Sequence, residues 1–248
     1  MYGKDIHSYR IYRQHQHPLK NVIIMIYVEN KKRKIEKIKE QYPNADILDI
    51  TSTSSVRYAQ ILSPFFPHGN IPIPFSPGYF SNCVEGIWQG LKVFGSCGID
   101  MESFSNNTMA GIKRTVRKYG PPRGHQKGIN STELLNYFDA RMQIYLPSYK
   151  WVLDNVQEVH DVVMRIAERS KTHDIVFLDY NTNTEFRDIS SPISHAGLVK
   201  LYIEGKYPDS NETIKPFTAE EIAALKKAKK NSKKKSVKNN KKQLNIFD

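Results

Sequence analysis

Residues 21–50 read NVIIMIYVENKKRKIEKIKEQYPNADILDI, and this stretch decides the fold class. Its first eight residues, 21–28, form a continuous apolar run rich in β-branched side chains, which predicts a buried strand. A charged segment, Lys31 to Gln41, has the spacing of a helix and is stopped by the Tyr-Pro-Asn sequence that follows it. Residues 45–50 predict a second strand. We therefore expect a strand–helix–strand unit, with a site in the polar loop at 51–55.

Beyond this unit the sequence predicts mostly helices. A further strand is expected at 174–180, whereas residues 62–79 hold five prolines and should be irregular. The expected helices lie at 83–94, at 134–145, at 156–166, after a Ser191 cap with Pro192 at the first position and Gly205 past the end, and at 219–228. We expect an α+β protein with a mainly helical core and one catalytic domain over 21–220, preceded by a polar arm at 1–20.

Positive charge is concentrated at the C-terminus. The net charge is +12, and residues 226–248 hold ten lysines against one acid, a charge of +9, so the rest of the chain carries only +3. A segment of this composition buries little surface, and its lysines attract nucleic acid without sequence preference. We therefore expect residues 221–242 to be a flexible basic tether that binds DNA.

The tether ends in an apolar peptide, Gln243-Leu244-Asn245-Ile246-Phe247-Asp248. It resembles the peptide by which bacterial proteins bind the sliding clamp of DNA polymerase, with isoleucine in place of one leucine. The resemblance implies that Leu244, Ile246 and Phe247 enter a groove while Gln243 forms a hydrogen bond beside it. The alternative is a chain end that folds back on the body.

Composition narrows the compartment and the cofactors. The two cysteines, Cys83 and Cys97, form no C-x-x-C pair, which argues against a disulfide scaffold or a zinc ribbon. No apolar run approaches the length of a membrane span. We expect a cytoplasmic protein of a bacterium or a phage-infected cell, associated with DNA, with no metal, cofactor or membrane partner.

Residues 62–67 (LSPFFP) and 84–92 (VEGIWQGLK) together suggest a pocket. Helical spacing places Glu85, Gln89 and Lys92 on one stripe, next to an aromatic and proline-rich loop. The loop offers stacking surface, and the helix offers hydrogen bonds and a general base. Spacing alone favours the alternative, an exposed helix face with paired charges.

The order and spacing of these two segments resemble the NADAR (YbiA-like) superfamily of N-glycosidases. The resemblance spans about residues 60–205. It implies cleavage of a bond between a ribosyl carbon and a nitrogen, on ADP-ribosylated guanine or a phosphoribosylated intermediate. It implies catalytic roles for Glu85, Asp188 and Trp151. It further implies a substrate-binding set: Ser63, Phe65, Trp88, Gln89, Lys92, Arg141 and His195. His195 stands where the family has asparagine, and the Trp-Gly pair expected beside Asp188 is absent.

A second constellation is the basic segment 113–128, in which glycines alternate with cations. Glycine lets the backbone approach a phosphate, and the cations neutralise it. The predicted phosphate-binding or DNA-binding residues are Arg114, Arg117, Arg123, His125 and Lys127. The alternative is a solvated basic loop.

Three functions are compatible with these features. The first is an enzyme that acts on the N-glycosidic bond of a guanine nucleotide in DNA, either removing ADP-ribose or exchanging guanine by transglycosylation. The second is a non-catalytic DNA-binding protein that associates with the clamp. The third is a glycohydrolase of small nucleotides.

Overall fold

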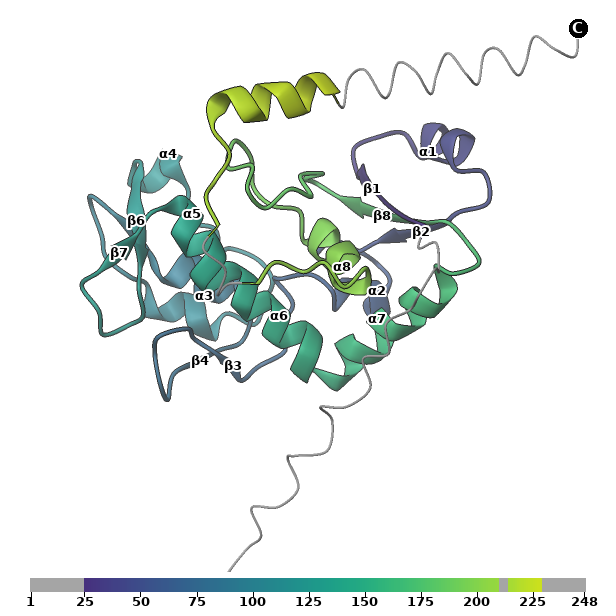
Figure 1. Ribbon diagram of the computed structural model, residues 1–248. Coiled ribbons are helices and arrows are strands. Elements are labelled where there is room, and N and C mark those ends of the chain that lie inside the picture. Colours follow the sequence, from purple (N-terminus) through teal and green to yellow (C-terminus); the bar gives the residue numbers. More distant parts are fainter. Residues whose placement is uncertain (1–24, 210–213, 229–248) are drawn as a thin grey trace, which may run out of the picture.

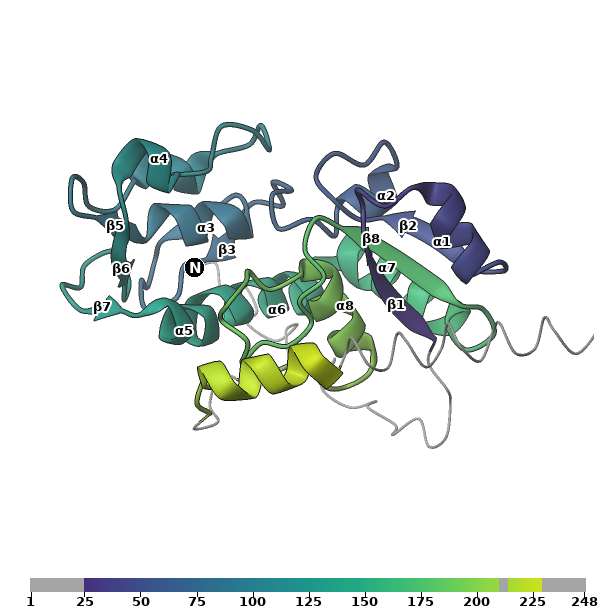
Figure 2. The same cartoon turned by 90° about the horizontal axis from the view of Figure 1, so that it is seen from above.

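The computed structural model describes residues 25–209 and 214–228, which form an α+β fold with three small sheets (Figure 1). Seen from above, the molecule has two parts side by side (Figure 2). One part holds the parallel sheet with α1, α2 and α7. The other holds α3, α5 and the antiparallel strands. Helices α6 and α8 lie between them.

The parallel sheet consists of β1 (Ile26–Asn30), β2 (Asp46–Asp49) and β8 (Ile175–Asp179), with β8 in the middle. Both neighbours pair with β8 in parallel register. Helix α1 (Ile35–Gln41) connects the two outer strands. Because all three strands run the same way, their carboxyl ends meet at one edge of the sheet, where parallel α/β sheets place their ligands.

The second part is built on α3 (Val84–Gly90) and on a continuous helical run. This run comprises α5 (Tyr137–Ala140), one π-helical turn (Arg141–Tyr145) and α6 (Leu146–Asn155). The remaining elements are the hairpin β3 (Ile71–Pro72) and β4 (Phe80–Ser81), the sheet β5 (Lys92–Phe94), β6 (Pro122–Gln126) and β7 (Leu134–Leu135), and the helices α2 (Arg57–Gln60), η1 (Met101–Ser105), α4 (Val116–Tyr119), α7 (Gln157–Arg169) and α8 (His195–Ile203).

The strand–helix–strand unit is confirmed, with shifted bounds. The first strand runs on to Asn30, and the part of the expected strand at 21–24 lies outside the described residues. Helix α1 starts at Ile35 and ends before Tyr42, as the Tyr-Pro-Asn sequence predicts. The strand expected at 174–180 is confirmed as β8, and the segment 62–79 is irregular apart from the two residues of β3.

The helix expected at 83–94 was predicted too long. It ends at Gly90, and Lys92 already belongs to β5, which pairs with β6. A Cβ on Gly90 would lie 2.3 Å from the Phe104 ring, so only glycine allows this close contact with η1. Glycine also weakens a helix, and Val93 and Phe94 favour a strand, so the chain changes structure here.

Two other helix starts differ from the prediction. The helix expected at 134–145 begins at Tyr137 with Asn136 as its N-cap, because Leu134 and Leu135 form β7. The helix expected after Ser191 is α8, which begins at His195, and the Ser194 side chain accepts a hydrogen bond from Gly197 N. The Ser191 carbonyl is instead bound by an arginine from the π-helical turn.

Residues 219–228 are helical, as predicted. Thr218 and Glu221 form a reciprocal capping box, in which each backbone N–H donates to the other side chain. The segment before this helix is fastened to the loop after β8: Arg187 Nε donates to the Lys215 carbonyl, and its guanidinium lies 4.0 Å from the Phe217 ring centroid. The first part of the expected tether is therefore regular structure. The arm at 1–20, residues 229–242 and the peptide 243–248 lie outside the described residues.

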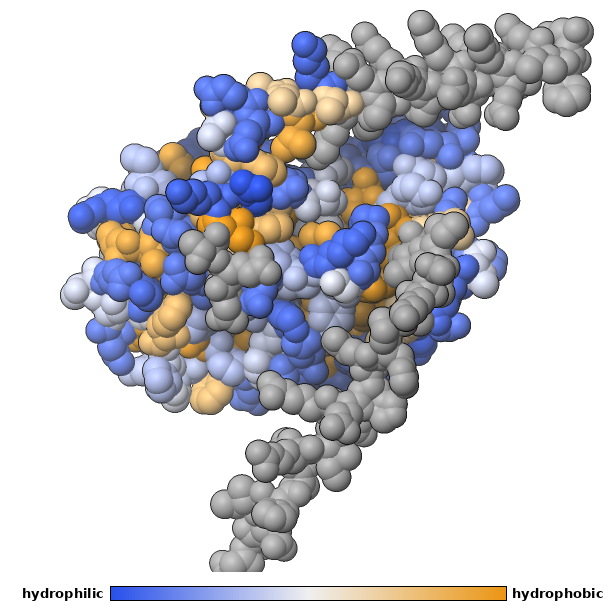
Figure 3. All heavy atoms as spheres, in the orientation of Figure 1, coloured by the Kyte–Doolittle hydropathy of each residue, from blue (hydrophilic) through white to orange (hydrophobic). Residues whose placement is uncertain are grey.

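Apolar side chains lie mainly in the interior of the protein, where they form its core. On the face drawn in Figure 3, hydrophobic residues form separate small areas among hydrophilic ones. Within residues 25–209 and 214–228, no helix is both long and apolar enough to cross a membrane.

Candidate active site

A cavity of about 350 Å³ lies between the two parts of the molecule. One wall comes from α3, the π-helical turn and the loop before α3. The other comes from the carboxyl ends of β2 and β8 and from the start of α8. The cavity brings together eight residues that the sequence predicts for the site: Ser63, Phe65, Glu85, Trp88, Gln89, Lys92, Arg141 and His195.

Glu85 is a buried carboxyl group on the cavity wall. Its backbone N–H donates to the Pro64 carbonyl (2.8 Å), which ties the start of α3 to the aromatic loop. Its Oε1 accepts a hydrogen bond from Gln89 Nε2 (2.7 Å). Among the described residues, Oε2 has no hydrogen-bond partner, so this oxygen remains available to a ligand. Burial raises the pKa of Glu85, although Gln89, Lys113 and Lys92 act in the opposite direction.

The orientation of Gln89 is set by its neighbours. Its Oε1 accepts hydrogen bonds from Lys92 Nζ (3.0 Å) and from the backbone N–H of Arg114 (3.1 Å). The amide nitrogen must therefore face Glu85. Lys92 thus lies next to Gln89, with which the sequence groups it, although it belongs to β5 and not to the helix. Burial lowers the pKa of its amine.

Aromatic rings line the cavity next to Glu85. Trp88 is half-buried and meets Tyr137 and Tyr145 edge-on, with ring centroids 5.8 and 5.6 Å away. Its nearest ring neighbour is His125, whose ring centroid lies 3.8 Å away. Burial lowers the pKa of His125 to about 3, so the imidazole is neutral. His125 therefore supports the Trp88 ring. The prediction that it binds phosphate is wrong, because its side chain is buried.

Asp179 and His195 form a buried ion pair on the opposite wall (side chains 6% and 10% exposed). His195 Nδ1 lies 3.1 Å from Asp179 Oδ2, and Nε2 donates to the Ile50 carbonyl (2.8 Å). Both ring nitrogens face acceptors, so both carry protons. Burial alone lowers the pKa of His195, but Asp179 outweighs it and raises the value. For Asp179 the effects are opposite in sign: burial raises the pKa of this carboxyl group, but His195 and the Ser194 hydroxyl bring it down to about 2.

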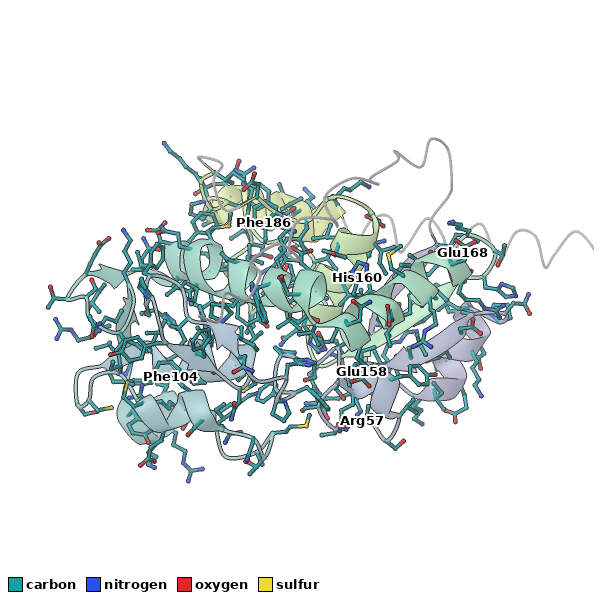
Figure 4. All side chains as sticks on the ribbon, turned by 90° about the horizontal axis from the view of Figure 1, so that it is seen from below. Arg57, Phe104, Glu158, His160, Glu168 and Phe186 are labelled. Carbon is teal, nitrogen blue, oxygen red and sulfur yellow. The ribbon has the colours of Figure 1, made fainter. Side chains whose placement is uncertain are left out.

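Arg141 is fully buried, and its guanidinium holds the loop between β8 and α8. Nη1 donates to the Phe186 and Asp188 carbonyls (2.8 and 2.9 Å), and Nη2 donates to the Ser191 carbonyl (2.8 Å) and the Tyr137 hydroxyl (3.1 Å). Figure 4 shows Phe186 next to the C-terminal helix. The predicted substrate-binding arginine thus positions this loop, because four of its donors are already used.

Two predicted catalytic residues do not line the cavity. Asp188 lies in the loop that Arg141 holds, where its Oδ1 accepts hydrogen bonds from the Ser190 backbone and hydroxyl. Trp151 lies on α6, beyond the cavity-lining turn, and packs against the core. The assignment of Asp188 as the second carboxylate at the cavity is therefore corrected: that position belongs to Asp179.

The basic segment divides into buried and exposed members. Arg114 is buried. Its guanidinium lies 5.0 and 5.3 Å from the ring centroids of Phe94 and Tyr119, and it donates to the carbonyls of Gln89, Lys92 and Gly98, so its contacts are with the protein itself. In contrast, Arg117 and Arg123 are exposed, and Lys127 pairs with Glu133 (3.1 Å).

Several cavity residues were not predicted from the sequence, above all Asp179, Tyr145 and Lys113. Asp179 could have been found from its place at the end of an expected strand, opposite the polar loop at 51–55. Tyr145 lies four residues after Arg141 in the helix expected at 134–145, and this spacing places the two side chains on one face. Lys113 sits over the Phe65 ring at 5.3 Å, and nothing in its spacing distinguishes it from the other cations of the basic segment.

In the described part of the chain, no group of three or more His, Cys, Asp or Glu side chains is arranged to hold a metal ion.

Comparison with known proteins gives a family but no activity. None of the curated proteins matches the chain. A family model described as a family of unknown function (DUF6939) matches residues 30–199, more than half of the chain. The chain belongs to this family.

Proposed function

We propose that this member of the DUF6939 family is an enzyme that breaks the N-glycosidic bond of a guanine nucleotide in DNA. The observation that carries the proposal is Glu85: a buried carboxyl group with one oxygen free, facing a cavity lined by aromatic rings and lysines. The resemblance of residues 62–67 and 84–92 to the NADAR superfamily supports this reading of the chemistry.

The cavity chemistry suits the bond. Cleavage between a sugar carbon and a base nitrogen creates positive charge on the sugar, which a carboxylate stabilises. A carboxyl group whose pKa is raised by burial can also take a proton from water and return it. Trp88 and Phe65 offer stacking surfaces for a base, and about 350 Å³ is at the small end of ligand pockets, which span roughly 300–1,000 Å³.

Glu85 is the group we assign to the reaction, and Asp179 has a supporting role. Asp179 Oδ1 accepts from the Tyr180 backbone (2.7 Å), and Oδ2 accepts from the Ser194 hydroxyl (2.7 Å) in addition to His195. With both oxygens engaged, Asp179 is a poor nucleophile. It fixes His195 as a positive charge on the cavity wall, opposite the wall that carries Glu85.

The DNA part of the proposal depends on the basic residues. The exposed Arg117 and Arg123 are candidates for contacts with the phosphate backbone. The clamp-binding peptide at 243–248 and the tether at 229–242 would bring the enzyme to replicating DNA. A base in a duplex must leave the stack before it enters such a cavity. The two versions of the reaction break different bonds. Removal of ADP-ribose breaks the bond between its ribosyl carbon and guanine, with water as the attacking group, and leaves guanine in the DNA. Exchange breaks the bond between guanine and its deoxyribose, with an incoming base as the attacking group.

The test is mass spectrometry of the bases and nucleosides produced from guanine-containing DNA. The wild type is compared with Glu85→Gln and with Glu102→Gln, which changes an exposed glutamate. Plain DNA, ADP-ribosylated DNA and free ADP-ribosylated guanosine are supplied in parallel, with and without a competing base. We expect release or exchange by the wild type and Glu102→Gln, and none by Glu85→Gln. Wild-type DNA binding without release on any substrate would refute the enzyme and favour a DNA-binding protein.

A further inference from the structure

Tyr145 has the one tyrosine hydroxyl on the cavity wall whose role the fold leaves unexplained. The Tyr137 hydroxyl accepts from Arg141, and the Tyr180 hydroxyl lies 3.2 Å from Thr53 Oγ1. Tyr145 lines the cavity through ring contacts with Trp88 and Tyr149, and among the described residues its hydroxyl has no hydrogen-bond partner. Tyr145 is only partly buried, and its hydroxyl is not one of the fully buried polar atoms without a partner. The hydroxyl is therefore not sealed inside the protein. It therefore opens on the cavity.

The Tyr145 ring is held firmly. Its edge contact with Trp88 spans 5.6 Å, and it stacks on Tyr149 at 6.5 Å between ring centroids. The Tyr149 hydroxyl is in turn bound to the Leu62 carbonyl (2.5 Å), at the start of the aromatic loop. Tyr145 also ends the π-helical turn, a feature that is often found at functional sites.

We infer that Tyr145 is a further catalytic residue, which donates a hydrogen bond from its hydroxyl to the departing base. The inference rests on the proposed function. A fixed donor aimed at developing negative charge lowers the barrier, and removal of one such donor costs about 10²–10³-fold in rate. Burial and the nearby Glu85 raise the pKa of Tyr145 well above its ordinary value, so the phenol keeps its proton at neutral pH.

The roles of Glu85 and Tyr145 are complementary in hydrolysis. The bond between the sugar carbon and the base nitrogen breaks, and its electron pair goes to the base. Water adds to the sugar carbon and gives its proton to Glu85, which then passes that proton to the departed base. Tyr145 exchanges no proton. It stabilises the charge on the base while Glu85 stabilises the charge on the sugar.

Leaving-group dependence distinguishes this role from a structural one. A guanine that is methylated at N7 carries a positive charge while it is attached and leaves as a neutral base, so it has little need of a donor. The experiment measures kcat of the wild type and Tyr145→Phe on guanine substrates, with or without ADP-ribose, in matched forms with and without the methyl group. We expect Tyr145→Phe to be slower by about 100-fold on guanine and by less than about 3-fold on 7-methylguanine.

Tyr207→Phe is the matched control. The Tyr207 hydroxyl donates to the Leu146 carbonyl (2.8 Å), so its loss should lower Tm and leave kcat unchanged. Tyr145→Phe should show the reverse, an unchanged Tm and a reduced kcat, with the same pH profile as the wild type between pH 5 and 9.

The two failures are distinguishable. If the wild type releases base or ADP-ribose, and Tyr145→Phe slows the methylated and unmethylated substrates equally or slows neither, the role of Tyr145 is refuted and the proposed function stands. If the wild type releases neither base nor ADP-ribose from any substrate, the proposed function fails and the role of Tyr145 fails with it.

Discussion

Replacing Asp179 by asparagine is expected to destabilise the protein by about 3 kcal/mol at pH 7. The carboxylate is 6% exposed and accepts hydrogen bonds from the Tyr180 backbone (2.7 Å) and the Ser194 hydroxyl (2.7 Å), besides its pair with His195. Asparagine keeps the shape but removes the charge, which leaves a buried imidazolium without its counter-ion. Breaking a buried pair in this way costs about 3–5 kcal/mol, and deprotonation of His195 recovers part of it.

The dependence on pH follows from the two pKa values. Lowering the Asp179 pKa from 3.8 to about 2 contributes about 2 kcal/mol of stability, which is present above pH 4 and lost as the pH falls to 2. The His195 pKa is raised, so its contribution is present below the ordinary value of 6.5 and lost as the pH rises through the raised value. Wild-type stability should therefore decline on both sides of a plateau. Asp179→Asn should lose the decline at high pH, and it should become less stable as the pH falls below 6.5, because burial alone lowers the pKa of His195.

The assay is urea unfolding followed by circular dichroism from pH 2 to pH 9, with the His195 pKa measured by NMR. The control is Asp46→Asn, at the other end of the same sheet. There the pair with Arg169 is exposed (side chains 41% and 48%), so its loss should cost less than about 1 kcal/mol. An Asp179→Asn variant within 1 kcal/mol of the wild type, or one with an unchanged His195 pKa, would refute the assignment of a buried ion pair.

Two other predictions concern packing and the basic segment. Gly90→Ala should lower Tm, at a cost of about 1–3 kcal/mol, because its Cβ would lie 2.3 Å from the Phe104 ring; Gly95→Ala, which meets nothing within 4 Å, should be neutral by calorimetry. Arg114→Ala should destabilise the fold without a specific loss of DNA affinity. Arg117→Ala should weaken DNA binding and its salt dependence without a change in Tm. Equal effects of the two variants on DNA binding would contradict the assignment of Arg114 to the fold and of Arg117 to DNA.

Local sequence patterns predicted the site well where its residues are close along the chain, and less well where they are far apart. Glu85, Trp88 and Gln89 share a short helix, so helical spacing was enough to group them, and the adjacent aromatic loop joins them through the contact of Glu85 N with the Pro64 carbonyl. Lys92 reaches Gln89 even though the helix ends at Gly90, because β5 continues in a direction that brings its amine back.

The predictions failed where a residue's role depends on distant partners. Arg141 and Arg114 look like free cations in the sequence, but carbonyl groups far along the chain occupy their donors. The same reason separates Asp188 from Asp179. Both are aspartates before a polar loop, and only the pairing of β8 between two other strands shows which of them faces the cavity.

The central place of β8 also governs the order in which the protein can fold. The strands β1 and β2 do not pair with each other, and each must wait for β8, which follows β2 after the 125 residues from 50 to 174. Closing so long a loop is slow compared with forming local helices. During synthesis, the first strands emerge without a partner and stay so until residue 179 has left the ribosome. The sheet and the wall of the cavity that holds Asp179 are therefore completed in one late step, so a chain that stops before β8 would have neither.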